Sequence, residues 1–329
     1  MQSRGGFVVS LDFELHWGVR DHLTVRQYRD NLLGARMAIP AMLELFARYG
    51  IHATWATVGF LFFRNRNELL DSLPERLPTY RDTRLDPYTA LSDLGWDEEE
   101  DPFHYAPSLI HKILTYEGQE IGTHTFSHYY PLAEGPTLES FRADIRCANE
   151  VAYRFGVSLK SIVFPRNQVS QPHLQTCSES GLIAYRGTGT DPWISKEGDT
   201  YARFMRFADS CICINSNGSV IPYRDPTYSI VDVPQSRFLR PWSSSQRVFS
   251  SIRLKRILAS MDAAAQSNRI FHLWWHPHNF GVHLEENMTV LTHIVDHYLH
   301  LHEELGWPSL TMAEAAEEIL QEERFPCIA

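Results

Sequence analysis

The chain has 329 residues, of which 43% are hydrophobic and 21% charged, and this ordinary globular composition excludes an intrinsically disordered protein. Its formal net charge of −10 disfavours a nucleic-acid-binding protein, because such a protein needs a basic face for the phosphate backbone. The five cysteines are scattered and odd in number, so they predict neither a disulfide framework nor a zinc ribbon.

No run of about 20 apolar residues predicts a membrane span. The apolar stretch at residues 7–11 is too short for the hydrophobic core of a signal peptide. We therefore expect a soluble protein in the cytoplasm.

Short strand-like runs alternate with helical patterns, which favours parallel strands joined by helical crossovers. The predicted strands are residues 7–12, 52–58, 120–123, 161–164, 182–185, 229–233 and 269–275. The predicted helices are residues 26–49, 106–116, 137–155, 171–180, 245–265, 285–304 and 311–322. Seven strands suit either a barrel or a doubly wound sheet, and periodicity does not choose between them.

Two segments follow neither the strand nor the helix period. Residues 74–105 and 186–228 read as long loops, which are uncommon unless functional. The acidic run at 97–101 within the first loop is interpreted as a solvated surface. Pro40 falls inside the first predicted helix and indicates a kink or a break there. No linker or repeat divides the chain, so we expect one domain spanning residues 1–329.

The first candidate site is the end of the first strand. Because strand side chains alternate, Asp12 and Glu14 lie on the same side, while Phe13 faces the other way. Two carboxylates at the carboxyl end of a parallel strand stand where such folds place active sites. An exposed acidic strand end is the alternative, but it does not explain why the pair faces inward.

Histidines follow two other predicted strands. His124 and His128 are four residues apart, a spacing from which two imidazoles can reach one metal. The spacing is common among 16 histidines, and the histidine-rich helix near the C-terminus is interpreted as a solvated face. At the last strand, alternation puts His276 nearest the carboxyl end, while His272 lies deeper and is predicted to be a core residue.

Taken together, these residues resemble the polysaccharide deacetylase family, the NodB-homology carbohydrate esterases. His124-Thr-Phe-Ser-His128 matches the family's His-Ser/Thr-x-x-His motif, and the acidic pair matches its first motif. The stretch 50–59 is similar to the family's second strand, and a strand-end arginine, Arg166, with the late histidine His276 completes the set. The resemblance runs from residue 7 to about residue 278.

The resemblance implies a distorted (β/α)7 barrel that binds one divalent metal. The implied metal ligands are Glu14, His124 and His128. The resemblance further implies that Asp12 is the general base, that Arg166 holds Asp12 ionised and oriented, and that His276 is the general acid.

The chain departs from the family pattern at three places. The acidic pair is Asp-x-Glu rather than Asp-Asp, so the roles of Asp12 and Glu14 could be exchanged. Pro165 precedes Arg166, which predicts a different loop there. Asp191-Pro-Trp193 is only a poor match to the family's fourth motif.

The implied chemistry is consistent in itself. An oxygen–nitrogen–nitrogen ligand set suits zinc, and cobalt, nickel, manganese or iron stay open. A carboxylate beside the metal can take a proton from water, and a histidine across the site can give one to the leaving nitrogen. Flat or polar surface for a sugar could come from Trp17, Trp193, Trp274 and His278, although core or rim packing explains the tryptophans equally well.

These observations favour a metal-dependent hydrolase that removes an N-acetyl group from an amino sugar. The expected substrate is a carbohydrate, either a polysaccharide or a sugar-nucleotide or lipid-linked precursor of a surface polysaccharide. A deformylase or another non-peptide amide hydrolase is the alternative within enzymes, and an inactive carbohydrate-binding barrel is the alternative outside them. The sequence does not predict the oligomeric state.

Overall fold

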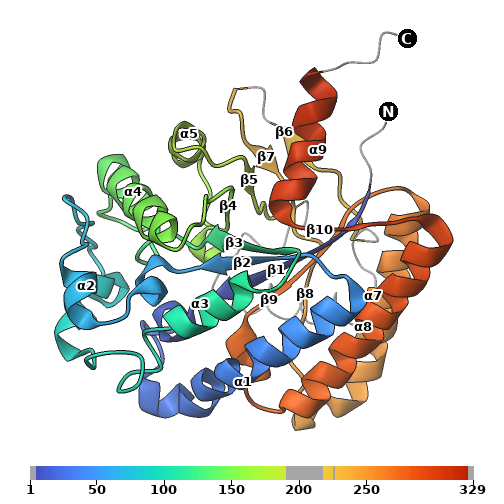
Figure 1. The fold of residues 1–329 in the computed structure, drawn as a ribbon, viewed down its shortest axis with the longest axis horizontal. Helices are drawn as coiled ribbons and strands as arrows, with labels where there is room; N and C mark the ends of the chain where they lie inside the picture. Colours follow the sequence, from blue (N-terminus) through green and yellow to red (C-terminus); the bar gives the residue numbers. More distant parts are fainter. Residues whose placement is uncertain (1–4, 190–217, 225–226, 325–329) are drawn as a thin grey trace.

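A parallel sheet forms the centre of the computed structural model, which describes residues 5–189, 218–224 and 227–324 (Figure 1). The strand order is β6-β7-β5-β4-β3-β2-β1-β9-β8, with β10 pairing with β1, and only the β6–β7 pair is antiparallel. The strands are β1 (Phe7–Phe13), β2 (Ala53–Thr57), β3 (Gln119–Thr123), β4 (Ser161–Ile162), β5 (Ala184–Tyr185), β6 (Tyr223–Arg224), β7 (Val231–Asp232), β8 (Arg237–Phe238), β9 (Phe271–Trp275) and β10 (Ser309–Leu310).

The sheet is curled. β7 and β8 lie on one extended stretch, residues 231–238, which pairs in parallel with β5 through its first part and with β9 through its last. Residues near the two ends of the parallel sheet are thus joined by a single short segment. The fold is an α/β protein with a curled sheet, as a distorted barrel requires.

Each predicted strand has a counterpart, and the predicted helices form as well. The helices are α1 (Val25–Tyr49), α2 (Arg66–Leu70), α3 (Pro107–Leu114), α4 (Leu138–Arg154), α5 (Gln171–Glu179), α7 (Arg247–Gln266), α8 (Leu284–Leu305) and α9 (Met312–Arg324). The short strands β6, β8 and β10 and the helix α2 were not predicted, because two to five residues carry too little periodicity.

The predicted break at Pro40 does not occur. α1 continues through Pro40 from Val25 to Tyr49. A capping box at Thr24 begins the helix, and Gly50, in the left-handed region with φ 63°, ends it. Packing of its buried face over the sheet outweighs the one lost backbone hydrogen bond.

The alternation predicted for the first strand is confirmed. Phe7, Val9 and Leu11 belong to the large core between the sheet and its outer helices, whereas Val8 belongs to a smaller core on the opposite face. α9 covers that inner face, with Met312 in the smaller core. In Figure 1, α9 lies above the strands, while α1, α3 and α8 lie below them.

The strands run from right to left in Figure 1, so their carboxyl ends meet at the left-hand side. The long segment 74–105 has no strand or α-helix, only the 3-10 turns η3 (Thr83–Leu85) and η4 (Pro87–Asp93). Within the described residues, no helix is both long and apolar enough to cross a membrane.

Candidate metal centre

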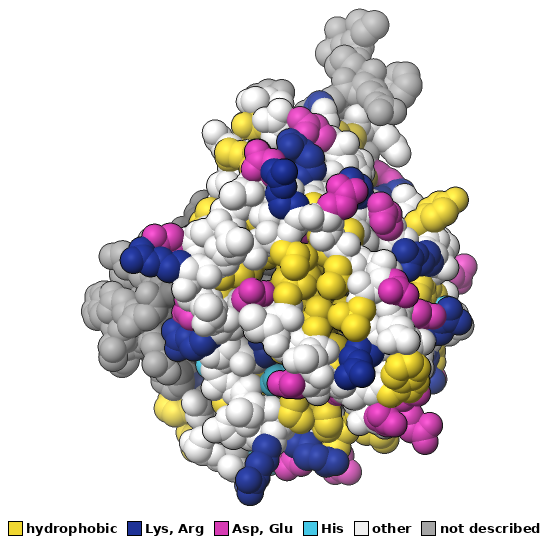
Figure 2. All heavy atoms as spheres, turned by 90° about the vertical axis from the view of Figure 1, so that its left-hand side faces the viewer, with side chains coloured by type: hydrophobic (Ala, Val, Ile, Leu, Met, Phe, Trp, Pro, Cys, Tyr) yellow, Lys and Arg dark blue, Asp and Glu magenta, His cyan; other side chains and the backbone are white. Residues whose placement is uncertain are grey.

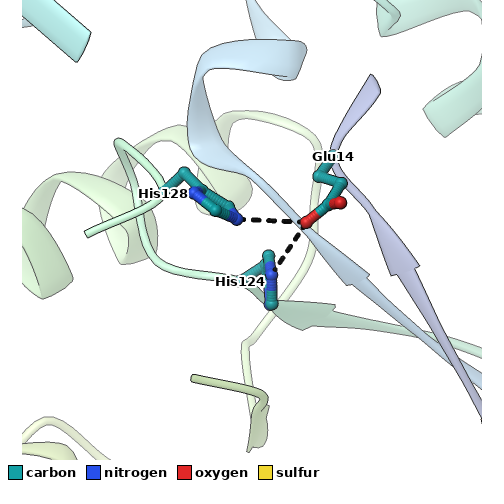
Figure 3. A group of neighbouring side chains, drawn as sticks. All are labelled: Glu14, His124 and His128. Atoms are coloured by element: carbon teal, nitrogen blue, oxygen red, sulfur yellow. Dashed lines mark hydrogen bonds and ion pairs between the residues drawn. The ribbon is translucent and has the colours of Figure 1, made fainter. Parts of the chain in front are cut away.

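Three buried side chains converge at the carboxyl ends of β1 and β3. The Oε2 atom of Glu14 lies 3.2 Å from Nε2 of His124 and 3.1 Å from Nε2 of His128. All three residues are buried, and they form the one His/Cys/Asp/Glu group with metal-binding spacing among the described residues. Figure 3 shows the two imidazoles pointing at the same carboxylate oxygen.

The loop that carries the two histidines is held from α4. Thr125 and His128 adopt left-handed backbone conformations, with φ 65° and 58°, which turn the chain back on itself. The carboxylate of Asp144 accepts hydrogen bonds from the amides of Phe126 (2.7 Å) and Ser127 (3.1 Å) and from the Ser127 hydroxyl (2.5 Å). Burial raises the pKa of Asp144 to about 7. These bonds fix the direction of both imidazoles.

The donor set fits a small divalent cation. Nδ1 of His124 donates to the carbonyl oxygen of Val163 at 2.8 Å, so the lone pair of its Nε2 faces Glu14. Four ligands about 2.0–2.2 Å from a tetrahedral cation are about 3.3–3.6 Å apart, close to the separations seen here. Glu14, His124 and His128 would therefore hold the cation and leave a fourth position open.

The electrostatics favour the metal-binding protonation states of Glu14 and His128. Burial alone would raise the pKa of Glu14, but the imidazoles of His276, His124 and His128 outweigh it and hold that pKa well below its usual range. Burial lowers the pKa of His128 to about 4, so its ring is neutral at physiological pH. A carboxylate and neutral imidazoles are the forms that bind a metal.

Asp12 lies beside this group and is held by Arg186, an arginine that was not among the predicted site residues. Nη1 and Nη2 of Arg186 donate to the two carboxylate oxygens of Asp12 at 2.6 and 2.8 Å. Burial raises the pKa of Asp12, yet the charge and hydrogen bonds of Arg186 outweigh it and lower that pKa. Arg186 directly follows the predicted strand 182–185, a strand-end placement that could have identified it.

The role predicted for Arg166 is wrong, because Arg186 takes it. Arg166 forms an ion pair with Asp21 and lies 4.6 Å above the ring of Tyr130. Pro165 starts a turn, η5 (Pro165–Asn167), in which Arg166 has a left-handed φ of 55°, and this different loop directs the guanidinium to the rim. Its neighbour Asn167 accepts a hydrogen bond from Nη2 of Arg186 at 3.3 Å.

His276 lies on the other side of the carboxylates. Its Nε2 is 3.6 Å from Oε1 of Glu14 and 3.7 Å from Oδ2 of Asp12. The side-chain amide of Asn279 contacts its Nδ1 at 3.2 Å, and the hydroxyl of Tyr28 in α1 donates to Asn279 at 3.0 Å. The ring is thus held with Nε2 facing the site.

His278 is a buried neighbour rather than an open contact surface. Its Nε2 lies 3.9 Å from Oε1 of Glu14, and its ring stacks on that of His276. Burial and the nearby His276 lower the pKa of His278 to about 3. His278 therefore adds a neutral imidazole to the wall of the site.

The tryptophans predicted to contact substrate lie in different surroundings. Trp274 packs beneath the guanidinium of Arg186 at 4.1 Å and against His276. Trp17 is fully buried, with its ring on Phe60, so its predicted contact with substrate is wrong: the turn after β1 directs it into the core. Trp193, with Asp191, lies outside the described residues.

The prediction that His272 is a satisfied core residue is confirmed. Its Nδ1 donates to the carbonyl oxygen of Val233 at 3.0 Å, and its Nε2 meets the Ser10 hydroxyl at 2.8 Å. Ser10 also accepts from Nη1 of Arg186 at 3.0 Å. His272 thus supports, through Ser10, the arginine that holds Asp12.

Figure 2 views the end of the molecule to which the strands point. Hydrophobic side chains gather near the middle of this face, and acidic and basic side chains are interspersed around them. No broad area of a single charge is visible on the part of this face that the structure describes.

Comparison with known proteins shows the fold. A structure described as a polysaccharide deacetylase of Mycobacterium smegmatis matches with a TM-score of 0.60 and 13% sequence identity, covering 98% of this chain and 92% of that chain. A structure described as a polysaccharide deacetylase of Pseudomonas aeruginosa matches with a TM-score of 0.58 and 12% identity, covering 97% of this chain and 91% of that chain. The fold is that of these proteins.

An allantoinase also has this fold. It matches with a TM-score of 0.55 and 12% identity, covering 95% of this chain and 88% of that chain. No family model matches the chain, and no curated protein matches its sequence. The curled α/β fold is thus shared with solved deacetylase structures, and the count of seven βα units stays a prediction. A shared fold does not by itself decide the activity.

Proposed function

We propose that the protein is a metal-dependent hydrolase that removes an N-acetyl group from an amino sugar. The observation that carries this proposal is the convergence of Glu14, His124 and His128 on one point, directly beside Asp12. The fold shared with polysaccharide deacetylases supports the proposal.

We assign the steps of amide hydrolysis to a bound cation and to two side chains of the site. A divalent cation, most simply zinc, would polarise the amide carbonyl and make water more acidic. Asp12, ionised because Arg186 outweighs its burial, accepts a proton from the attacking water. His276, across the carboxylates, donates a proton to the leaving nitrogen. Arg186 keeps Asp12 oriented and charged before each turnover.

The proposed substrate class is a carbohydrate. Trp274, in β9, offers an aromatic surface beside His276 that suits the apolar face of a sugar ring. An N-acetylated amino sugar, in a polysaccharide or in a precursor of one, has both an apolar ring face for Trp274 and an amide bond for the metal centre.

A non-sugar amide is the second candidate, favoured by the structural match to an allantoinase. The same residues would act on either amide, so the two candidates are distinguished by which substrate is hydrolysed. Acetate release from N-acetylated sugars, nucleotide sugars and chitooligosaccharides should be measured beside hydrolysis of allantoin and N-formyl sugars. Turnover of an acetylated sugar supports the first candidate, and turnover of allantoin alone supports the second.

The roles of Asp12 and Glu14 are tested by two amide variants. We expect Asp12→Asn to keep its metal and lose about 10²–10⁴-fold in turnover, because the amide cannot accept a proton. We expect Glu14→Gln to lose metal as measured by elemental analysis, because a neutral amide is a weak ligand. A metal-free Asp12→Asn and a loaded, inactive Glu14→Gln would exchange the two roles. Full activity in both variants would overturn the hydrolase proposal.

A further inference from the structure

The turn that follows β1 folds back onto Glu14. The turn η1 (Leu15–Gly18) starts at Leu15, whose left-handed φ of 46° is unusual for a residue other than glycine. The amide of Trp17 donates to the Glu14 carbonyl at 3.1 Å. A Cβ atom added at Gly18 would lie only 1.9 Å from Cδ of Glu14. The backbone of this turn therefore forms one wall against the Glu14 carboxylate.

The same turn is tied to a distant segment by a chain of two imidazoles. Nδ1 of His16 lies 2.8 Å from Nε2 of His104, and Nδ1 of His104 lies 2.8 and 2.9 Å from the two carboxylate oxygens of Asp101. At the other end, Nε2 of His16 donates to the carbonyl oxygen of Leu23 at 2.9 Å. All four ring nitrogens thus have a partner.

Further contacts join the same two segments. The amide of His16 donates to the Phe103 carbonyl at 3.2 Å, and Nε1 of Trp17 donates to the His104 carbonyl at 3.0 Å. The rings of Trp17 and His104 pack edge to face. These bonds cross about 90 residues of sequence, so the segment around residue 104 acts as a brace for the turn.

Asp101 corrects the interpretation of the acidic run as a solvated surface. Glu99 and Glu100 are exposed, but Asp101 is buried. Besides His104, its carboxylate accepts from the amides of Gly95 at 3.1 Å and Phe103 at 3.3 Å. Asp101 therefore supports the end of segment 74–105 from within, next to Phe103 and His104, which contact the turn directly.

We propose that Asp101, His104 and His16 are positioning residues that hold Glu14 in its metal-binding place. The inference rests on the metal site of the proposed function. Glu14 is the one carboxylate of the ligand group and stands on a strand end followed by a strained residue, Leu15. The hydrogen-bonded chain Asp101–His104–His16 holds η1 in position. The backbone of η1 at Gly18 in turn packs against the Glu14 carboxylate and limits where it can lie.

The test measures metal binding and needs no substrate. We expect His104→Leu to weaken Zn²⁺ and Co²⁺ binding about 10- to 100-fold, the usual effect of losing a partner that orients a ligand. His104→Gln, which keeps a donor toward His16, should retain most of the affinity. The visible absorption of the Co²⁺-loaded protein should change in His104→Leu, because the ligand geometry changes.

Gly18→Ala tests the contact between the backbone of η1 and the Glu14 carboxylate. Its methyl group would press on Glu14 while the chain from Asp101 to His16 stays intact, so metal affinity should fall without a large change in the melting temperature of the metal-free protein. If His104→Leu folds poorly, Asp101→Asn tests the chain instead, because it keeps the shape of Asp101 but weakens its bond to His104, and unchanged metal affinity in that variant would overturn the positioning role.

His297→Leu is the matched control. His297 binds the carboxylate of Asp262 at 2.7 Å between α7 and α8, so its loss removes a similar bond with no contact to a ligand of the site. We expect it to bind metal like the wild type. Unchanged affinity in His104→Leu and Gly18→Ala, or equal loss in His297→Leu, would overturn the positioning role and leave the proposed function standing. A wild-type protein that binds neither metal would overturn both.

Discussion

Glu14 is surrounded by imidazoles on both sides of its carboxylate. Oε2 faces His124 and His128 at 3.2 and 3.1 Å, and Oε1 faces His276 and His278 at 3.6 and 3.9 Å. The first pair has the spacing of ligands around one cation, whereas His276 also reaches Asp12. One residue thus joins the proposed metal-binding half of the site to its proton-transfer half.

The two arginines at the site should behave differently when each is replaced. We expect Arg186→Leu to lose about 10²–10⁴-fold in turnover and about 3–5 kcal/mol in the free energy of unfolding, because it leaves Asp12 charged and unpaired in the interior. Arg166→Leu, at the half-exposed rim, should cost far less in both. Steady-state kinetics and urea unfolding measure these losses.

The same comparison has a pH signature. Without Arg186, burial is no longer outweighed, so the pKa of Asp12 rises and the acid limb of the pH–rate profile moves to higher pH. Arg166→Leu should leave the limb in place. A profile that shifts in Arg166→Leu and not in Arg186→Leu would restore the role first expected for Arg166.

At the scale of elements, α1 and the turn after β9 are in backbone contact. A Cβ atom at Gly34 of α1 would lie 2.2 Å from Cα of Gly281, just past the turn η7 (Pro277–Phe280). One turn away on α1, Asn31 donates to the His278 carbonyl at 3.1 Å. Glycine is needed at positions 34 and 281 because the two backbones touch there. This contact packs the turn that carries His278 directly against α1.

A second contact between elements fixes α9 over the inner face of the sheet. The carboxylate of Glu120 in β3 accepts from the hydroxyl of Thr54 at 2.6 Å and from the amide of Ala313 at 3.2 Å. The hydroxyl of Thr54 accepts from the amide of Met312 at 2.8 Å. Two of the orphan donors in the first turn of α9 are satisfied by these strand side chains.

This contact predicts a stability difference between two variants. Glu120→Ala should lose about 1–3 kcal/mol in the free energy of unfolding, because buried donors lose their acceptor. Glu120→Gln should lose less, since it keeps an acceptor of the same shape. Burial raises the pKa of Glu120, so the interior already disfavours its charge and little is lost when the charge is removed. Urea unfolding measures both values. Equal losses would mean that the charge, not the acceptor, anchors α9.

At the scale of the whole molecule, several buried imidazoles are kept neutral. Burial is the largest cause in each case, and it lowers the pKa to about 4 in His16 and His128 and to about 3 in His272 and His278. The unfolded chain has ordinary histidine pKa values near 6.5. Between these values, unfolding takes up protons.

The stability of the metal-free protein should therefore fall as the pH drops below about 6.5. Each of these histidines contributes up to about 1.4 kcal/mol per pH unit down to about pH 3–4, where the folded protein also binds the protons. Asp144, whose pKa burial raises to about 7, offsets part of this loss because unfolding releases its proton, but the four histidines outweigh it. Urea unfolding at pH 7.5, 6.5 and 5.5 measures the slope. A free energy of unfolding that stays constant or rises from pH 7.5 to 5.5 would contradict the prediction.

The sequence alone predicted the main strands and the side chains that meet at their carboxyl ends, while the role of Glu14, His124 and His128 as metal ligands stays a prediction. Strand alternation put Asp12 and Glu14 on one side, and the placement of His124 and His276 after predicted strands brought them to the same end of the sheet. These inferences hold because the two-residue period of a strand and the parallel order of βα units are local properties of the chain. One domain, zinc, the carbohydrate partner and the cytoplasm stay predictions.

Only the tertiary structure decided which distant groups meet. Arg186 rather than Arg166 holds Asp12, because two left-handed residues after Pro165 turn Arg166 toward Asp21. Asp101 reaches the turn beside Glu14 through two imidazoles, although its acidic neighbours predict a solvated surface. Ion pairs and buried polar contacts depend on loop geometry and three-dimensional proximity, and neither is encoded in a short sequence period.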